Sequence, residues 1–153
     1  MDYFVDSSAL VKRYVHETGS VWLSGLVAQA AGNDIYIARI TTVEVIAALT
    51  RRTRGGTIAT ADASAACLLF RNDLSHDYEI VEMTATLLNR AMTLAETHGL
   101  RGYDAVQLAA VCEVNAFCAA HGLPPLTLVS ADSELNTAAP GEGLPVDDPN
   151  AHP

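Results

Sequence analysis

The chain has 153 residues, of which 50% are hydrophobic and 18% are charged, and this size and composition are typical of one compact globular domain. General disorder is excluded, and no run reaches the roughly 18 to 20 apolar residues that a membrane-spanning helix needs. The formal net charge of −9 excludes binding of nucleic acid through a broad basic surface, which needs an excess of lysine and arginine. The first residues lack the basic start of a secretory signal, so we expect a soluble, cytoplasmic protein without a membrane partner.

The predicted elements alternate between strands and helices along the chain. Short apolar or β-branched runs predict strands, in chain order, at residues 3–5, 35–38, 78–82 and 126–130. Apolar residues at helical spacing, with capping residues before them and glycine after several of them, predict helices over 9–15, 21–30, 41–54, 60–73, 84–97 and 103–121. Residues 132–137 form at most a short helix, and 144–146 could add an edge strand.

This alternation predicts the fold class. Strands that are apolar on both faces and separated by one or two helices are typical of a parallel sheet with helices on both faces. We therefore expect a three-layer α/β/α domain with a parallel sheet of four or five strands, formed by residues 1–146. The acidic, proline-containing residues 147–153 are expected to form a flexible tail.

Four acidic residues follow strands or begin helices, at the end of the sheet where functional groups gather in this class of fold. Asp6 directly follows the first strand, and Asp132 follows the last strong strand by two residues. Glu44 and Asp104 lie in the first turns of two predicted helices. Taken singly, each acid could be a capping or turn residue that the helix dipole favours. Together they can converge on one crevice.

The surroundings of these acids favour a metal site. Glu44 and Asp104 stand among apolar residues that should face the interior, where a carboxylate must find a partner. No lysine follows Lys12, and few arginines are placed to neutralise four acids. Mg²⁺ or Mn²⁺ is the natural partner, because hard cations bind carboxylate oxygen and keep waters that a substrate phosphate can replace. The three cysteines have no paired spacing, which argues against a zinc site or a disulfide.

Four short motifs resemble, in order and at the usual separations, the acidic motifs of PIN-domain ribonucleases. They are residues 5–12 (VDSSALVK), 42–45 (TVEV), 101–109 (RGYDAVQLA) and 130–132 (SAD). The resemblance covers essentially the whole chain and is greatest with the short, single-domain VapC-like toxins of prokaryotic toxin–antitoxin pairs.

This resemblance implies a PIN-like fold in which Asp6, Glu44, Asp104 and Asp132 bind one or two divalent ions and carry out endonucleolytic cleavage of RNA. It also implies a homodimer, and an antitoxin protein whose C-terminal segment enters the active-site groove of the toxin.

Further residues could support the site or contact the substrate. Ser7 belongs to the first motif, and Ser130 stands where the family often has threonine or serine. Arg101 could orient a carboxylate or touch phosphate, or it could be an exposed residue at a helix start. The cluster of Arg51, Arg52 and Arg54 could line a nucleic-acid path, bind an acidic partner, or form a solvated helix end that the dipole favours.

The expected reaction is metal-assisted hydrolysis of a phosphodiester bond. Asp6 and Asp104 are the expected primary ligands, and Glu44 and Asp132 complete the charge or hold a second ion. Two alternatives stay open. A phosphotransferase with an aspartate nucleophile is disfavoured by Ser8, which stands where a second acid is usual, and by the absence of late lysines. A catalytically silent PIN-like binding module would be expected to have lost one of the acids.

Overall fold

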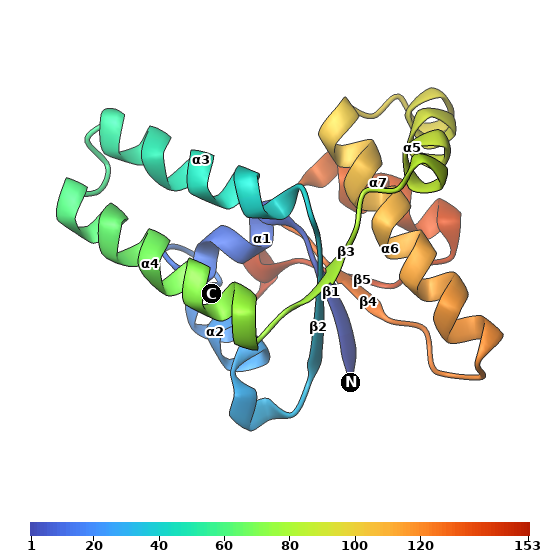
Figure 1. Cartoon of the computed structure of the whole chain (residues 1–153), viewed down its shortest axis with the longest axis horizontal. Coiled ribbons are helices and arrows are strands. Elements are labelled where there is room, and N and C mark those ends of the chain that lie inside the picture. The colour runs from blue at the N-terminus through green and yellow to red at the C-terminus, as the bar shows by residue number, and fades with distance from the viewer.

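The computed structural model describes every residue, from 1 to 153, and confirms the expected α/β class. All strand pairs are parallel, and they form one five-stranded sheet in the order β3-β2-β1-β4-β5. The strands are β1 (Asp2–Val5), β2 (Asp34–Ala38), β3 (Glu79–Val81), β4 (Thr127–Val129) and β5 (Val146–Asp147). Because β1 lies in the centre of the sheet, the residue that follows it is flanked by the ends of two neighbouring strands (Figure 1).

Helices cover both faces of the sheet. They are α1 (Ser7–Leu10), α2 (Ser20–Val27), α3 (Thr41–Arg54), α4 (Thr60–His76), α5 (Ala85–His98), α6 (Gly102–Ala120) and α7 (Ser133–Ala138). Figure 1 shows α1 to α4 on one side of the sheet and α5 to α7 on the other. The short 3-10 helices are η1 (Val11–Arg13), η2 (Gln29–Ala31), η3 (Ala139–Glu142) and η4 (Pro149–Ala151). None of the helices combines the length and hydrophobicity that crossing a membrane requires.

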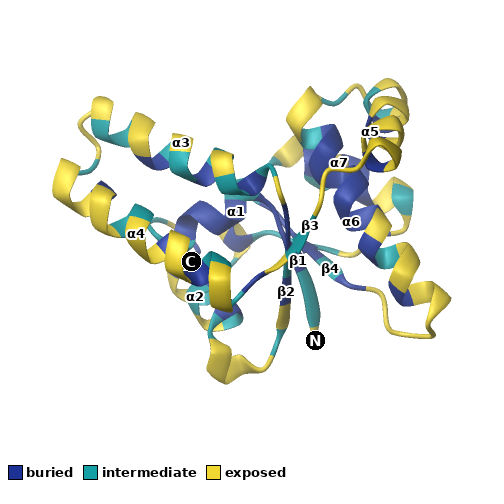
Figure 2. Cartoon of the chain, in the orientation of Figure 1, coloured by how far each residue is buried: buried dark blue, intermediate teal, exposed yellow.

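Each face of the sheet has its own hydrophobic core. On the side of α1 to α4, 13 buried residues form the core, Leu10, Leu49 and Phe70 among them. On the opposite side, 20 buried residues form a second core around α6, which buries ten of its own residues. Figure 2 shows the middle turns of α6 buried and its first turn exposed. With roughly 1.5–3 kcal/mol for each fully buried large apolar side chain, the two cores hold α3 and α6 against the sheet.

The helix expected over residues 9–15 is shorter in the structure, where α1 ends at Leu10 and η1 follows. Lys12 is 6% exposed and turns inward, and its Nζ lies 3.1 Å from Glu17 Oε1 and 3.0 Å from the Thr18 carbonyl oxygen. This pairing, made with residues only five and six positions further along the chain, competes with continuation of the helix. A buried ammonium must be paired, so the pairing overrides the local helical pattern.

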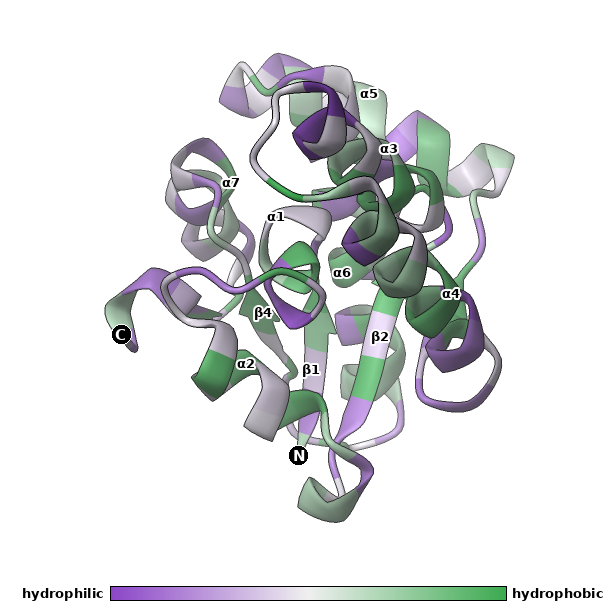
Figure 3. Ribbon diagram, turned by 90° about the vertical axis from the view of Figure 1, so that its left-hand side faces the viewer, coloured by the Kyte–Doolittle hydropathy of each residue, from purple (hydrophilic) through white to green (hydrophobic).

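Residues 147–153 were expected to form a flexible tail, and the structure differs. Val146 and Asp147 pair with β4 as the edge strand β5, so the expected strand at 144–146 begins later. The His152 ring stacks on Trp22 with centroids 4.2 Å apart, and His152 Nε2 lies 2.7 Å from Asp147 Oδ1. Figure 3 shows the C-terminal residues beside α2. Proline and acids predict disorder locally, but here contacts made across the chain order the segment.

Gly19 shows how closely this C-terminal segment, residues 147–153, lies against the domain. Its φ of +84° is in the left-handed region that favours glycine, and a Cβ built at this position would lie 2.3 Å from the Pro149 carbonyl oxygen. Pro149 itself is buried. The backbone at the start of α2 therefore approaches the C-terminal segment at a distance that only glycine permits.

Candidate active site

The four acids predicted from the sequence lie at the ends or starts of elements that meet at the carboxyl edge of the sheet. Val5 and Val129 are register partners in β1 and β4, so Asp6 and Ser130 follow two neighbouring strands at the same level. Glu44 lies in the first turn of α3, after β2, and Asp104 lies in the first turn of α6. The strand order thus places groups from distant parts of the chain at one edge.

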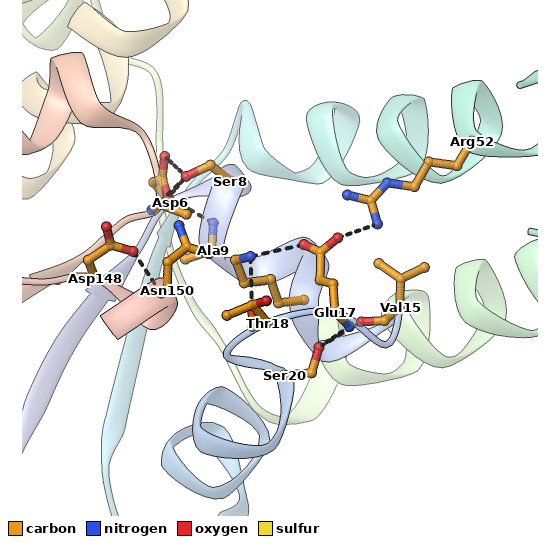
Figure 4. A network of polar contacts seen from close by, with 12 residues as sticks. Asp6, Ser8, Ala9, Val15, Glu17, Thr18, Ser20, Arg52, Asp148 and Asn150 are labelled. Atoms are coloured by element: carbon orange, nitrogen blue, oxygen red, sulfur yellow. Dashed lines mark hydrogen bonds and ion pairs between the residues drawn. The ribbon is translucent and has the colours of Figure 1, made fainter. Parts of the chain in front are cut away.

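Asp6 is the most buried of the four acids, with 2% of its surface exposed. It caps α1: Oδ1 accepts hydrogen bonds from Ser8 Oγ at 2.8 Å and from the Ala9 amide at 3.1 Å (Figure 4). Burial raises the pKa of Asp6 from 3.8 to about 7, and the nearby charge of Glu44 adds to this, whereas the bonds from Ser8 and Ala9 oppose it. A buried carboxyl group with so few positive neighbours would bind a cation readily at neutral pH.

Glu44 is held by α6. Its Oε1 accepts a hydrogen bond from Gln107 Nε2 at 2.7 Å, and the same amide nitrogen donates to Thr41 Oγ1 at 2.9 Å. Burial raises the pKa of Glu44 and the charge of Asp104 adds to the rise, while hydrogen bonds from Gln107 and Ser7 lower it. Ser7, expected as a supporting residue, therefore lies against Glu44 and favours its charged form.

Asp104 has the most open position among the three acids whose pKa is raised, the other two being Asp6 and Glu44. Burial and the charge of Asp132 raise its pKa, whereas Arg101 lowers it. The side chain of Arg101 is 78% exposed, and its Nε lies 3.8 Å from Glu134 Oε2. Arg101 thus acts on Asp104 through its charge and remains exposed at the rim of the site.

Asp132 is the N-cap of α7, and its Oδ1 accepts hydrogen bonds from the Glu134 and Leu135 amides, both at 2.9 Å. The preceding loop is fixed from two sides. The fully buried Ser130 accepts the Asp132 amide at its Oγ at 3.1 Å, and Ser8 Oγ accepts the Ala131 amide at 2.9 Å. Ser8 therefore connects the loop after β1 to the loop after β4.

The four carboxylates form a series of electrostatic neighbours. Charge on Glu44 raises the pKa of Asp6, charge on Asp104 raises that of Glu44, and charge on Asp132 raises that of Asp104. Arg101 is the one basic residue that acts against these shifts. Like charges in such a series repel one another, and a divalent cation between them would remove the repulsion.

The fit to a metal ion rests on the kind of donor atoms. The structure has no group of three His, Cys, Asp or Glu side chains arranged closely enough to hold a metal ion. Two of the acids, Asp6 and Asp132, instead cap helices with one oxygen each. Mg²⁺ is usually held by only one or two carboxylates with waters in its other positions, so the oxygen donors at this edge fit a hard, largely hydrated cation.

Sequence analysis missed two residues that organise the site. Gln107 belongs to the motif at residues 101–109, but no role is predicted for it from the sequence. Its place three residues after Asp104 puts it near the same face of α6. For Ser8 the sequence predicts a place among the residues that can cap the first helix, but it gives no sign that the hydroxyl contacts both Asp6 and the loop of Asp132. Spacing within one helix indicates the first role, but no local signal indicates a bond across 123 residues.

The arginine cluster at the end of α3 is divided in its contacts. Arg52 Nη1 lies 2.9 Å from Glu17 Oε2 (Figure 4), and Glu17 also accepts a hydrogen bond from Lys12, so Arg52 ties α3 to the segment before α2. Arg51 and Arg54 form no ion pair in the structure, and both are exposed. Only these two of the three arginines are free to meet a ligand.

A parallel sheet covered on both faces, with acids from four elements at its carboxyl edge, defines the class of protein. The chain belongs to the PIN domain family, whose model matches residues 3–139. Two curated relatives from Mycobacterium tuberculosis strains, ribonuclease VapC45 and ribonuclease VapC49, are each 33% identical to this chain over 151 residues. The matches cover 94% of this chain and 92% of each relative.

Solved structures agree with this fold. The chain is similar to PAE2754 from Pyrobaculum aerophilum, with a TM-score of 0.65 and 23% identity over 99% of this chain and 91% of that one. It is also similar to VapC20 from Mycobacterium tuberculosis, described as a toxin that cleaves the sarcin–ricin loop, with a TM-score of 0.61 and 18% identity over 89% of this chain and 94% of that one. A chain of the VapBC2 complex from Rickettsia felis, bound to a DNA fragment from its promoter, has a TM-score of 0.63 and 16% identity over 97% and 98% of the two chains.

Proposed function

We propose that this PIN-domain protein is a divalent-metal-dependent endoribonuclease and the toxin of a toxin–antitoxin pair, acting in the cytoplasm. The observation that carries the proposal is the 33% identity to two ribonucleases named VapC along 94% of the chain, together with the four acids at the carboxyl edge of the sheet. The phosphotransferase alternative finds no support in these relatives.

Asp6, Glu44, Asp104 and Asp132 would hold Mg²⁺ or Mn²⁺ through their carboxylate oxygens. When bound, such an ion would supply an activated water for attack on phosphorus and positive charge for the phosphate oxygens. The protein's own part is to fix the ligands before substrate arrives, a contribution that depends on neighbouring hydrogen bonds as much as on the ligands themselves.

Three supports of this kind surround the site. Ser8 orients Asp6, Gln107 orients Glu44, and Ser130 fixes the loop that carries Asp132. Arg101 extends into solvent at the rim, where its guanidinium can contact a phosphate oxygen. Because the whole chain carries a formal charge of −9, attraction of the RNA backbone depends on the bound cation and on a few basic side chains near the site.

An antitoxin protein is the proposed partner. Two solved structures similar to this chain come from assemblies described as VapBC2 and as a toxin–antitoxin complex, from Rickettsia felis and Klebsiella pneumoniae. The candidate partner is the protein encoded by a gene adjacent to the gene for this chain. We expect the two proteins to purify together when they are expressed together.

A homodimer is the second proposed assembly, and exposed apolar side chains support it. Leu88 and Met92 lie one turn apart on α5 and are 38% and 62% exposed. Sedimentation at tens of micromolar protein should give the mass of two chains. Monomeric Met92→Lys, with its fold retained, would place the interface on α5, and a monomeric wild-type protein would exclude the dimer.

Incubation of partner-free protein with RNA tests the proposed activity. We expect cleavage in Mg²⁺ or Mn²⁺, no cleavage in EDTA, and loss of cleavage in Asp104→Asn. Asp62→Asn is the matched control, because Asp62 also lies in the first turn of a helix but on α4. Metal-loaded wild-type protein that binds RNA without cutting it would support the silent binding module instead.

A further inference from the structure

We propose that the ring of Tyr103 is a stacking platform for an unpaired base of the RNA, beside the bond that is cut. The inference rests on the proposed function and deepens it, because it names the part of the substrate that this chain recognises without using charge. It assigns to the site a binding position for a nucleobase, next to the acids that act on the phosphate.

Tyr103 is unusual among the aromatic residues of the chain in its exposure. Only Tyr103 and Phe117 are exposed, at 65% and 60%. The Phe117 ring is partly covered by His121, with centroids 4.1 Å apart, whereas Tyr103 packs against no aromatic ring. The structure thus leaves one aromatic ring open to a ligand, one residue before Asp104.

The helix geometry places this ring over the site. Side chains four residues apart lie on the same face of a helix, so Tyr103 shares a face of α6 with Gln107. Gln107 is 1% exposed and donates to Glu44 at 2.7 Å, and this face of α6 is therefore the one that meets the acid of α3. Tyr103 lies one turn closer to the start of α6, where the helix emerges into solvent (Figure 2). The ring accordingly stands at the exposed start of α6, one turn before Gln107 and one residue before Asp104.

The charge of the chain supports a base contact at this point. The formal charge of the chain is −9. Arg101 is the one basic residue whose charge lowers the pKa of a site acid, and its Nε also lies 3.8 Å from Glu134 Oε2. Few phosphate contacts are therefore available, and another kind of contact has to hold the strand in place. Stacking on a tyrosine is independent of net charge and accepts any base, since every base has a π-face.

Fluorescence of a short single-stranded oligoribonucleotide that contains 2-aminopurine tests the proposal directly, because stacking quenches this base. The full chain carries Asp6→Asn so that the RNA stays intact, and Mg²⁺ is present. We expect quenching on binding, its loss in Tyr103→Ala with a roughly ten-fold weaker Kd, and retention of both in Tyr103→Phe. Phe117→Ala is the matched control, because Phe117 is similarly exposed fourteen residues further along α6, about 21 Å away.

The outcomes separate this inference from the proposed function. If the Asp6→Asn protein binds RNA and Tyr103→Ala leaves both quenching and Kd unchanged, stacking on Tyr103 is wrong while the ribonuclease proposal stands. An equal loss in Phe117→Ala would also overturn it, because any exposed ring would then do. If wild-type protein neither binds nor cuts RNA, the proposed function fails and the inference fails with it. A stacking contact further requires the Tyr103→Ala effect to be the same at 50 and 200 mM salt, unlike a phosphate contact.

Discussion

Gln107 of α6 donates its side-chain amide to Glu44 of α3 at 2.7 Å, so an acid on one side of the sheet is held by a helix on the other side. Gln107 is fully inside the protein, and its Oε1 has no hydrogen-bond partner. A buried unpaired carbonyl oxygen is costly, by about 1–3 kcal/mol, and such groups persist mainly where the other contacts of the residue matter. The Gln107 amide therefore holds Glu44 in place, while its unpaired Oε1 lowers the stability of the fold.

Replacing Gln107 by methionine should change the pH dependence of cleavage. The hydrogen bond from Gln107 lowers the pKa of Glu44, so its loss raises that pKa further and keeps Glu44 protonated to a higher pH. We expect the acidic limb of the pH–rate profile to move to higher pH. Asn115→Leu, on the same helix two turns further on and also with an unpaired amide oxygen, is the control and should leave the profile in place.

Asp6 should make the metal-free protein less stable as the pH rises. Its pKa is about 7 in the folded chain, against an ordinary value of 3.8, so at a pH between these values the folded state holds a proton that the unfolded state has released. The contribution of Asp6 to the free energy of unfolding is therefore highest below about pH 4. It falls by at most roughly 4 kcal/mol as the pH rises through 7. In thermal unfolding in EDTA, Asp6→Asn should melt at a higher temperature than wild type at pH 8 and at the same temperature as wild type at pH 4. Asparagine also caps helices well, so the cap itself is preserved.

Divalent cations should reverse that effect. An ion that binds only the folded state at 100 times its Kd adds about 2.7 kcal/mol to the free energy of unfolding. Wild-type protein at pH 8 should therefore melt at a higher temperature in Mn²⁺ than in EDTA, and Asp104→Asn should lose most of the difference. Asp62→Asn should keep it, since Asp62 is a first-turn acid of α4 outside the site. An equal rise in all three proteins would mean that the ion acts elsewhere.

The C-terminal segment should contribute measurably to stability through its contact with Gly19. A Cβ at this position would lie 2.3 Å from the Pro149 carbonyl oxygen, so Gly19→Ala must displace the segment. Gly32→Ala is the matched control, because Gly32 also has a positive φ, +64°, but no atom within 4 Å of the added Cβ. Both variants should lose about 1 kcal/mol from the backbone conformation, and Gly19→Ala should lose clearly more in denaturant unfolding. Equal losses would show that the segment is not held in solution.

The sequence allowed the α/β class, the four longest helices and the positions of the four acids to be predicted, because each depends on local pattern. Apolar periodicity identifies α3 and α6, and an acid after a strand is visible as such in Asp6. The interactions between these elements could not be predicted. The end of α1 depends on the hydrogen bonds of Lys12 with Glu17 and Thr18. The ordered conformation of residues 147–153 depends on Trp22, more than 120 positions away. Neither the contacts of Lys12 with residues five and six positions away nor the stacking of Trp22 on His152 leaves a periodic signal in the sequence.

The bond between Ser8 and Ala131 has a consequence for the synthesis of the protein. Residues that follow β1 make one side of the site, and β4 and α7, which are translated more than 120 residues later, make the other side. A growing chain that already contains Asp6, Glu44 and Asp104 still lacks the strand that aligns them, since β4 lies directly beside β1. We expect incomplete chains ending before residue 127 to be inert toward RNA. A cell that makes this protein would then meet its activity only after β4 and α7 of each copy have been translated.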